Sequence, residues 1–339
     1  MKRIDNLFTK ICSMDNLILA EKKARRGKSR TIGVRLFDRD REGNLQRLRE
    51  LLLSGQFKTS EYTNFIIYEP KERLISRLPY YPDRIVHHAV MNVLEPIWVS
   101  IFVKNTYSCI KHRGIHKAVN DLKKDLRNDV AGTKYCLKID IKKYYPSINH
   151  DVLKSIIRKK IKDARLLSLL DEVIDSADGI PIGNYLSQYF ANLYLSYFDH
   201  HMKEKYGCKY YCRYADDIVV LSDSKEHLRS ILGAMQEELG ELHLTIKENW
   251  QIFPVESRGI DFLGYVFRHT YTKLRKSTKK RLIRKVVALS KLRMSFEKKW
   301  QELASYFGWL KYCNSTCLKN HLNTICNEQI FLRNYAISI

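Results

Sequence analysis

The residues with the clearest chemical potential are two adjacent aspartates, Asp216 and Asp217, which interrupt an apolar and aromatic run over residues 210–221. The flanking residue types predict a strand, a tight turn and a second strand. Two carboxylates at the tip of such a hairpin are costly unless a cation neutralises them, and hard divalent metals bind carboxylate oxygens. A third carboxylate, Asp140, ends an alternating run over 134–140. Three aspartates at neighbouring strand ends could hold two metal ions for an in-line phosphoryl transfer, whereas an isolated Asp-Asp pair is usually a solvated turn.

The elements that must position these aspartates alternate along the chain. Strand patterns cover 62–68, 134–140 and 210–221, and residues 71–77 alternate charged with apolar side chains, as a hairpin does. Helical patterns cover 15–60, 83–94, 151–173, 184–207 and the stretch that ends at Gly240. This order of strand, helices, hairpin, helix and hairpin predicts an α+β fold, in which an antiparallel sheet carries helices on one face.

A basic helix is predicted near the end of the chain, where residues 271–339 hold 15 basic and 3 acidic side chains. One face of this helix is apolar and the other is cationic. The apolar face comprises Leu282, Ile283, Val286, Val287, Leu289 and Leu292, and the cationic face comprises Lys280, Arg281, Arg284, Lys285 and Lys291. A solvated surface is the ordinary explanation of such a face, and contact with a nucleic-acid duplex is the other.

The overall composition suits a polyanionic partner. The 339 residues include 60 Lys and Arg against 37 Asp and Glu, a formal net charge of +23. No apolar run approaches the roughly 20 residues that span a bilayer, and the N-terminus lacks the apolar stretch of a secretory signal. We therefore expect a cytoplasmic protein with no membrane partner. The eight cysteines are not spaced as in zinc ribbons, so we expect reduced, mostly buried thiols.

Several motifs resemble those of reverse transcriptases. Tyr214-Ala215-Asp216-Asp217 between two apolar strands is similar to the catalytic hairpin of that family, and residues 140–148 resemble its first metal-binding motif, with 75 residues between Asp140 and Asp216. Residues 94–98, 105–108 and 114–118 look like the fingers of bacterial, intron-type enzymes, and residues 262–265 resemble the hairpin that grips the primer. The resemblance runs from about Met14 to Phe267.

This resemblance implies a right-hand polymerase fold in three parts. Residues 1–130 would form an N-terminal extension and the fingers, and residues 131–268 the palm, with finger elements near 151–185. Residues 269–339 would form a basic helical thumb, whose cationic face follows a duplex.

The resemblance also implies roles for individual residues. Two Mg²⁺ ions, for which Mn²⁺ could substitute, would be held by Asp140, Asp216, Asp217 and the main-chain carbonyl of Ile141. The ring of Tyr145 would lie under the sugar and exclude a ribose 2′-hydroxyl.

The remaining implied roles concern nucleotide, template and primer. Lys71, Arg73 and Arg77 are candidates for gripping the triphosphate, since guanidinium and ammonium groups pair well with phosphate oxygens. Lys247 would protonate the pyrophosphate, and Ile182 and Gly183 would contact the incoming deoxynucleoside triphosphate. The residues expected to contact the template RNA or the RNA/cDNA duplex are Gln188, Tyr214, Leu263, Gly264, Arg281, Arg284 and Lys285.

The segment 182–188 bears on the type of reverse transcriptase. Intron, retroviral and retron enzymes usually carry Gln-Gly here and often Ser-Pro after it, whereas this chain has Ile182 and Gln188 in place of the Gln and the Pro. That pattern resembles the enzymes of diversity-generating retroelements, which copy a template repeat RNA with frequent errors at adenines. Such enzymes work with a small basic accessory protein that forms a helical barrel. Ordinary drift at a helix start is the alternative explanation.

Three other functions compete with this interpretation. The first is a group II intron or retron reverse transcriptase. The second is a reverse-transcriptase-like RNA-binding protein without catalysis, against which the three aspartates argue and which a primer-extension assay would test. The third is a helical DNA-binding protein, which accounts for the charge but not for the ordered motifs.

Overall fold

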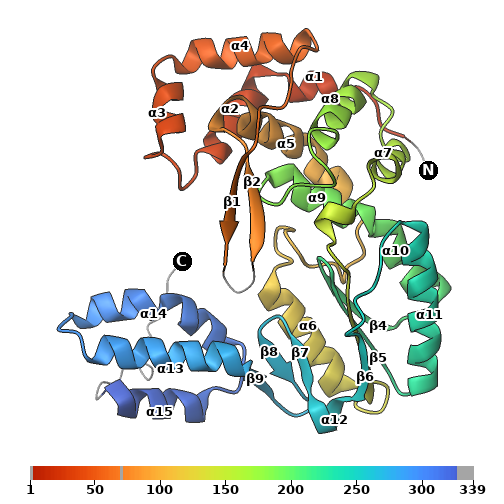
Figure 1. Cartoon of the computed structure of the whole chain (residues 1–339), viewed down its shortest axis with the longest axis vertical. Coiled ribbons are helices and arrows are strands. Elements are labelled where there is room, and N and C mark those ends of the chain that lie inside the picture. Colours follow the sequence, from red (N-terminus) through yellow and green to blue (C-terminus); the bar gives the residue numbers. More distant parts are fainter. Residues whose placement is uncertain (1–2, 69–71, 327–339) are drawn as a thin grey trace.

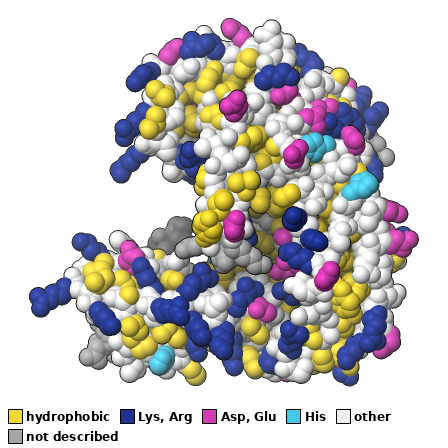
Figure 2. Space-filling view, in the orientation of Figure 1, with side chains coloured by type: hydrophobic (Ala, Val, Ile, Leu, Met, Phe, Trp, Pro, Cys, Tyr) yellow, Lys and Arg dark blue, Asp and Glu magenta, His cyan; other side chains and the backbone are white. Residues whose placement is uncertain are grey.

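The computed structural model describes residues 3–68 and 72–326. Three lobes enclose an open hollow (Figures 1 and 2). The N-terminal lobe comprises α1 (Phe8–Ile11), α2 (Met14–Ala24), α3 (Ile32–Asp38), α4 (Arg41–Leu53), the hairpin β1 (Thr63–Ile67) and β2 (Arg73–Arg77), η1 (Tyr80–Arg84) and α5 (Ile85–Val99). The helical stretch predicted over 15–60 is divided into α2, α3 and α4 and ends at Leu53, and the predicted hairpin is formed by β1 and β2.

The central lobe is built on a four-stranded antiparallel sheet of order β4-β5-β3-β6. Its strands are β3 (Tyr135–Asp140), β4 (Tyr210–Tyr214), β5 (Asp217–Ser222) and β6 (Gln251–Pro254). The helical elements of the lobe are α6 (Ile115–Asn128), η2 (Tyr145–Ser147), α9 (Tyr185–Tyr194), α10 (Ser196–His200), η3 (His201–Lys205) and α11 (Lys225–Glu241). The intervening helices α7 (His150–Arg158) and α8 (Ala164–Ile174) lie beside α1 in the N-terminal lobe (Figure 1).

Alternation along the strands divides the sheet between two hydrophobic cores. Leu137, Ile139 and Val220 face the core that α9, α11 and the N-terminal lobe share. The residues between them, such as Cys136 and Val219, face a second core with α6. Because successive side chains of a strand point to opposite faces, a sheet covered on both sides needs central strands with consecutive apolar residues, as β5 has over residues 218–221. The sheet is thus covered by helices on both faces, not on one face as predicted.

The chain then forms a short helix, a small sheet and a helical lobe. These elements are α12 (Val255–Arg258), β7 (Ile260–Phe262), β8 (Tyr265–Phe267) and β9 (Thr272–Leu274), followed by the C-terminal lobe of α13 (Lys276–Ser290), α14 (Phe296–Lys311) and α15 (Thr316–Cys326). Leu282, Val286 and Leu289 of α13 are buried in the second core, as predicted. Leu292 is not part of that face, because α13 ends at Ser290 and Leu292 is 51% exposed.

Two predicted helices are interrupted in the structure. The single helix expected over 151–173 is divided into α7 and α8, because Asp163 caps α8 by accepting a hydrogen bond from the N–H of Leu166. The same carboxylate accepts the N–H groups of Leu7 and Phe8, both at 2.8 Å. The helix expected over 184–207 is divided at Leu195, and the chain turns away at Gly207, where φ is +65°. Within the described residues, no helix is long and apolar enough to span a membrane.

Candidate active site

Three aspartates meet at one end of the four-stranded sheet. β3 ends at Asp140 and β5 begins at Asp217, and these residues are direct partners in the antiparallel register. Tyr214 also pairs with Asp217, so Ala215 and Asp216 alone form the turn between β4 and β5. The N–H of Ile141 donates to the carbonyl of Asp216 at 3.2 Å, which fastens the turn to the end of β3. The predicted strand, turn and strand at this motif are therefore present.

Burial and neighbouring negative charge disfavour the ionisation of Asp216 and Asp217. Burial raises the pKa of Asp217 to about 7; Lys138 opposes that rise, and the charges of Asp140 and Asp216 add to it. Burial also raises the pKa of Asp216, and the charge of Asp140 raises it further. Carboxylates that cannot all ionise at low cost gain stability from a nearby cation.

Two lysines supply positive charge at this site. The ammonium group of Lys247 pairs with Asp140 Oδ1, and its main-chain N–H donates to the Asp140 carbonyl at 2.8 Å. Lys138 Nζ lies 3.7 Å from Asp217 Oδ1 and donates to the Asp261 carbonyl at 2.5 Å. Lys247 is thus at the carboxylate cluster, and Lys138 is a second cation that the sequence analysis did not single out.

The donor set fits a hard divalent cation. Asp217 Oδ1 is buried and accepts no hydrogen bond, and its nearest cation is the Lys138 ammonium group at 3.7 Å, so a metal ion would give this oxygen a closer partner. The donors that would be offered are all oxygens, which Mg²⁺ prefers. As the side chains stand, no three His, Cys, Asp or Glu side chains in residues 3–68 and 72–326 are grouped to chelate a metal. Instead, the two lysine ammonium groups contact Asp140 and Asp217.

Tyr145 lies beside the carboxylates in the turn η2. Its ring is half-buried and packs edge-on against Tyr144 with the ring centroids 5.6 Å apart. Burial raises the pKa of its hydroxyl, and the negative charge of Asp216 contributes to that rise. The Tyr145 carbonyl accepts the N–H of Ile180 at 2.9 Å, which joins η2 to the segment that leads into α9.

The hairpin of the N-terminal lobe is fastened to the segment Ile182-Gly183. The N–H of Ser76 on β2 donates to the Ile182 carbonyl at 2.8 Å. Gly183 has φ +128°, and a Cβ there would lie 2.9 Å from the Ser76 carbonyl oxygen, so the close approach requires glycine. Gln188 follows one turn into α9 and is half-buried.

Cations line the same hairpin. Arg73 begins β2, and its charge lowers the pKa of Asp216 against the effect of burial. Arg77 ends β2, with its guanidinium carbon 5.9 Å from the centroid of the Phe65 ring. Lys71 lies outside the described residues.

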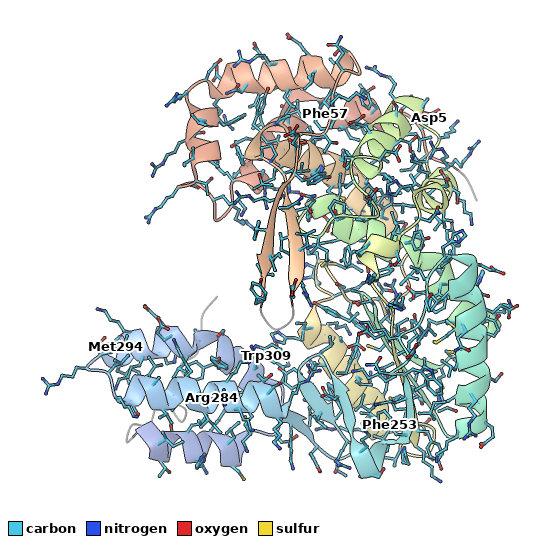
Figure 3. The ribbon with its side chains drawn as sticks, viewed as in Figure 1. Asp5, Phe57, Phe253, Arg284, Met294 and Trp309 are labelled. Atoms are coloured by element: carbon cyan, nitrogen blue, oxygen red, sulfur yellow. The ribbon has the colours of Figure 1, made fainter. Side chains whose placement is uncertain are left out.

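The turn Leu263-Gly264 connects the small sheet to the C-terminal lobe. The two residues have φ of +49° and +82°. A Cβ on Gly264 would lie 2.8 Å from Trp309 Cη2, and the Tyr265 hydroxyl donates to the Trp309 carbonyl at 3.0 Å. Figure 3 shows Trp309 at the end of the C-terminal lobe nearest this sheet.

The cationic face of α13 is partly neutralised. Arg281 and Arg284 are exposed, and Arg284 lies in the middle of the helix (Figure 3). Lys285 instead pairs with Glu302 of α14 at 2.5 Å. In Figure 2, Lys and Arg side chains gather on the C-terminal lobe where it borders the hollow.

One buried ion pair, which lies behind the turn Ala215-Asp216, was not predicted from the sequence. Arg213 and Asp199 both have 0% exposure, and Arg213 Nη2 lies 2.5 Å from Asp199 Oδ2. The available signal was an arginine inside an otherwise uncharged strand, directly before Tyr214.

Comparison with known proteins identifies the family. Residues 68–267 match the family described as "Reverse transcriptase (RNA-dependent DNA polymerase)". Protein YkfC of Escherichia coli is 27% identical over 65% of this chain and 70% of its own length. The group II intron-encoded protein LtrA of Lactococcus lactis is 26% identical over 36% of this chain and 22% of its own length. The retron Ec73 reverse transcriptase of Escherichia coli is 27% identical over 44% of this chain and half of its own length.

Solved structures agree on the fold. Telomerase from Candida tropicalis, in complex with a fragment of telomeric RNA, superposes with a TM-score of 0.52 at 12% identity, covering 81% of this chain and 53% of that one. This likeness and the family match confirm the predicted right-hand polymerase fold. We therefore identify the chain as a member of the reverse transcriptase family of RNA-dependent DNA polymerases.

Proposed function

We propose that this chain copies an RNA template into DNA by two-metal phosphoryl transfer at Asp140, Asp216 and Asp217. The observation that carries the proposal is the convergence of three carboxylates at one end of the sheet, where a buried oxygen of Asp217 accepts no hydrogen bond. Asp140 and Asp216 would be the main ligands of two Mg²⁺ ions, for which Mn²⁺ could substitute. The Ile141 carbonyl would be a further ligand and Asp217 the weaker one. When bound, the ions would lower the pKa of the primer 3′-hydroxyl and neutralise negative charge on the triphosphate.

The neighbouring residues then act on the nucleotide. Tyr145 would hold its ring under the sugar and exclude a 2′-hydroxyl, a role that its half-buried position beside Asp216 supports. Arg73 and Arg77, with Lys71, would hold the triphosphate from the hairpin. Lys247 would give a proton to the leaving pyrophosphate, and its contact with Asp140 supports that role.

All three lobes would contact the nucleic acid. We assign the fingers to residues 1–130, the palm to 131–268 with finger elements near 151–185, and the thumb to 269–339. Within the first range, α6 packs against the palm sheet and would belong to the palm. Exposed arginines on α13 support contact of the thumb with the duplex. The residues assigned to template and primer are Gln188, Tyr214, Leu263, Gly264, Arg281, Arg284 and Lys285.

Primer extension tests the proposed catalysis. Asp216→Ala should abolish Mg²⁺-dependent cDNA synthesis on an RNA template while leaving RNA affinity nearly unchanged. Asp223→Ala is the matched control, because Asp223 is exposed just beyond the other end of β5. Synthesis by the Asp216 variant at the wild-type rate would reject the two-metal assignment. Absence of synthesis by the wild-type protein would favour the non-catalytic RNA-binding alternative.

We further propose that the enzyme is of the diversity-generating retroelement type and makes errors opposite template adenines. Ile182 supports this subtype, since an isoleucine side chain has no hydrogen-bonding group for the incoming nucleotide, whereas glutamine has. Each lost hydrogen bond is worth roughly 0.5–1.5 kcal/mol, which corresponds to severalfold to about tenfold in discrimination. The same resemblance implies the small basic accessory protein as a partner. The group II intron and retron alternative is favoured by the relatives LtrA and Ec73.

Sequencing of cDNA separates these two subtypes. The wild-type enzyme should misincorporate most often opposite adenine on a defined RNA, and Ile182→Gln should lower that error rate. Equal error rates opposite all four template bases in the wild type would reject the retroelement subtype and leave a conventional reverse transcriptase.

A further inference from the structure

The side chain of Arg213 has all of its hydrogen-bonding capacity engaged inside the protein. Its Nε and Nη2 groups donate to the two oxygens of Asp199 at 2.7 and 2.5 Å. Nη1 donates to Asn192 Oδ1 at 3.3 Å and to the Ala215 carbonyl at 3.1 Å, and Nη2 also donates to the Asn192 carbonyl at 3.4 Å. A guanidinium has five N–H donors, so none is left over.

Asp199 is equally saturated. Besides the two bonds from Arg213, its Oδ1 accepts the hydroxyl of Tyr211 at 2.6 Å and its Oδ2 accepts the hydroxyl of Thr106 at 2.9 Å. Burial opposes the charge on Arg213, but Asp199 outweighs that effect and holds the pKa of the guanidinium above its ordinary value. A buried ion pair contributes little net stability compared with an apolar replacement, so a stabilising role alone does not account for this network.

The main chain of Arg213 is fixed as well. β4 is an edge strand of the sheet. On its outer side the main chain of residues 105–107 pairs with it at Arg213. The N–H of Arg213 donates to the Asn105 carbonyl, and its carbonyl accepts the N–H of Tyr107, both at 3.0 Å. The guanidinium therefore projects from a rigid base into the interior.

One bond of this network reaches the catalytic turn. Ala215 has φ +54°, a left-handed conformation that residues other than glycine adopt at a cost. Its carbonyl belongs to the peptide plane that precedes Asp216, and Arg213 Nη1 holds that carbonyl from inside. The peptide unit that follows Asp216 is held by a hydrogen bond from the Ile141 N–H to the Asp216 carbonyl. The peptide units on both sides of Asp216 are thus restrained.

We infer that Arg213, held by Asp199, is a positioning residue: it fixes the Ala215 peptide and so aims the Asp216 carboxylate at the cation site. This inference rests on the proposed metal-binding role of Asp216. Its function requires both the charge and the forked shape of the side chain, because a single guanidinium spans Asp199, Asn192 and the turn. An ammonium group has three donors at one point and cannot span the same acceptors.

The test removes the ion pair without leaving a buried charge. In Arg213→Met/Asp199→Asn the pair is lost as a whole, so the fold should persist, but the Ala215 carbonyl loses its donor. Binding of Mn²⁺ to the nucleic-acid-free protein, followed by electron paramagnetic resonance, should weaken about tenfold, the effect of losing one good hydrogen bond. In primer extension, kcat should fall at least tenfold while KM for the nucleotide changes by less than twofold.

Tyr211→Phe is the matched control. It removes a hydrogen bond to the same carboxylate but leaves the Ala215 contact, so it should lower the melting temperature without changing Mn²⁺ affinity. Wild-type Mn²⁺ affinity in the double variant, or an equal loss in Tyr211→Phe, would overturn the inference. If the double variant does not fold, Arg213→Lys decides: weakened Mn²⁺ binding supports the inference and wild-type binding overturns it. An active Asp216→Ala enzyme would instead refute the proposed function itself.

Discussion

Lys247 is bonded to Asp140 twice, through its ammonium group to the carboxylate and through its main-chain N–H to the carbonyl. The first contact puts an ammonium group on a carboxylate that is proposed to hold a metal ion. The second, at 2.8 Å, keeps the residue in place when the side chain moves. We therefore expect the Lys247 ammonium group to release Asp140 when a cation binds there, while the main-chain hydrogen bond keeps the residue at the site.

Replacing Lys247 should have opposite effects on metal binding and on turnover. Lys247→Met removes a cation that competes for Asp140, so Mn²⁺ should bind the nucleic-acid-free protein more tightly. Turnover should fall by about 100-fold, the usual contribution of a positioned general acid. Lys154→Met is the control, because Lys154 forms a comparable pair with Asp175 at 2.6 Å outside the site. Unchanged turnover in Lys247→Met would mean that the lysine is only a counter-ion in the free enzyme.

Tyr145 should control the choice of sugar. Tyr145→Ala removes the half-buried ring and opens space for a 2′-hydroxyl, so ribonucleotides should be incorporated at least tenfold more readily relative to deoxynucleotides. Tyr145→Phe keeps the ring and should keep the selectivity. The measurement is the ratio of kcat/KM for the two nucleotide classes on one RNA template. A constant ratio across all three proteins would place the steric gate elsewhere.

The part of the site that the sequence predicted consists of charged residues next to apolar strands in the sequence. Asp140, Asp216 and Asp217 stand out because carboxylates at the ends of apolar strands are costly, and the antiparallel register then pairs Asp140 with Asp217. Ala215 and Asp216 form the turn without a long loop, so the pattern of strand, turn and strand was sufficient.

The features that the sequence did not predict depend on partners distant in the chain. Asp163 interrupts the expected helix over 151–173 because it binds the N–H groups of Leu7 and Phe8, more than 150 residues away. Arg213 finds Asp199 on α10, and neither residue alone predicts the pair. The periodicity of a sequence predicts which face of a single helix or strand is apolar. The positions of these side chains depend instead on how several helices and strands pack together.

Gly264 should be essential for holding the C-terminal lobe against the small sheet. Gly264→Ala forces a side chain into a left-handed conformation, φ +82°, and to within 2.8 Å of Trp309 Cη2. We expect a loss of about 1–3 kcal/mol in the free energy of unfolding and shorter cDNA products per binding event. Gly233→Ala is the control, since that position in α11 has open space and alanine should stabilise the helix by up to about 1 kcal/mol. Wild-type stability and product length in Gly264→Ala would show that Trp309 moves freely away.

Burial of His87 should make the stability of the protein depend on pH. His87 lies in α5 with 2% exposure, and its Nε2 has no hydrogen-bond partner. Burial, together with the smaller effects of the charges of His88 and Arg84, lowers its pKa to about 3. The folded protein therefore keeps this imidazole neutral, whereas the unfolded chain takes up a proton below about pH 6.5. The free energy of unfolding should fall as the pH drops from 6.5 towards 3, by up to about 1.4 kcal/mol per pH unit for this one proton.

Urea denaturation at pH 7, 6, 5 and 4 measures this dependence. In His87→Leu the loss of stability on acidification should be smaller than in the wild type by the contribution of one proton. Other ionising groups are common to both proteins and cancel in the difference, apart from His88, whose charge acts on His87. His321→Gln, which changes an exposed histidine, should follow the wild-type curve. Parallel curves for the wild type and His87→Leu would mean that His87 is protonated inside the folded protein, with an acceptor for its Nε2 that water or a moved side chain provides.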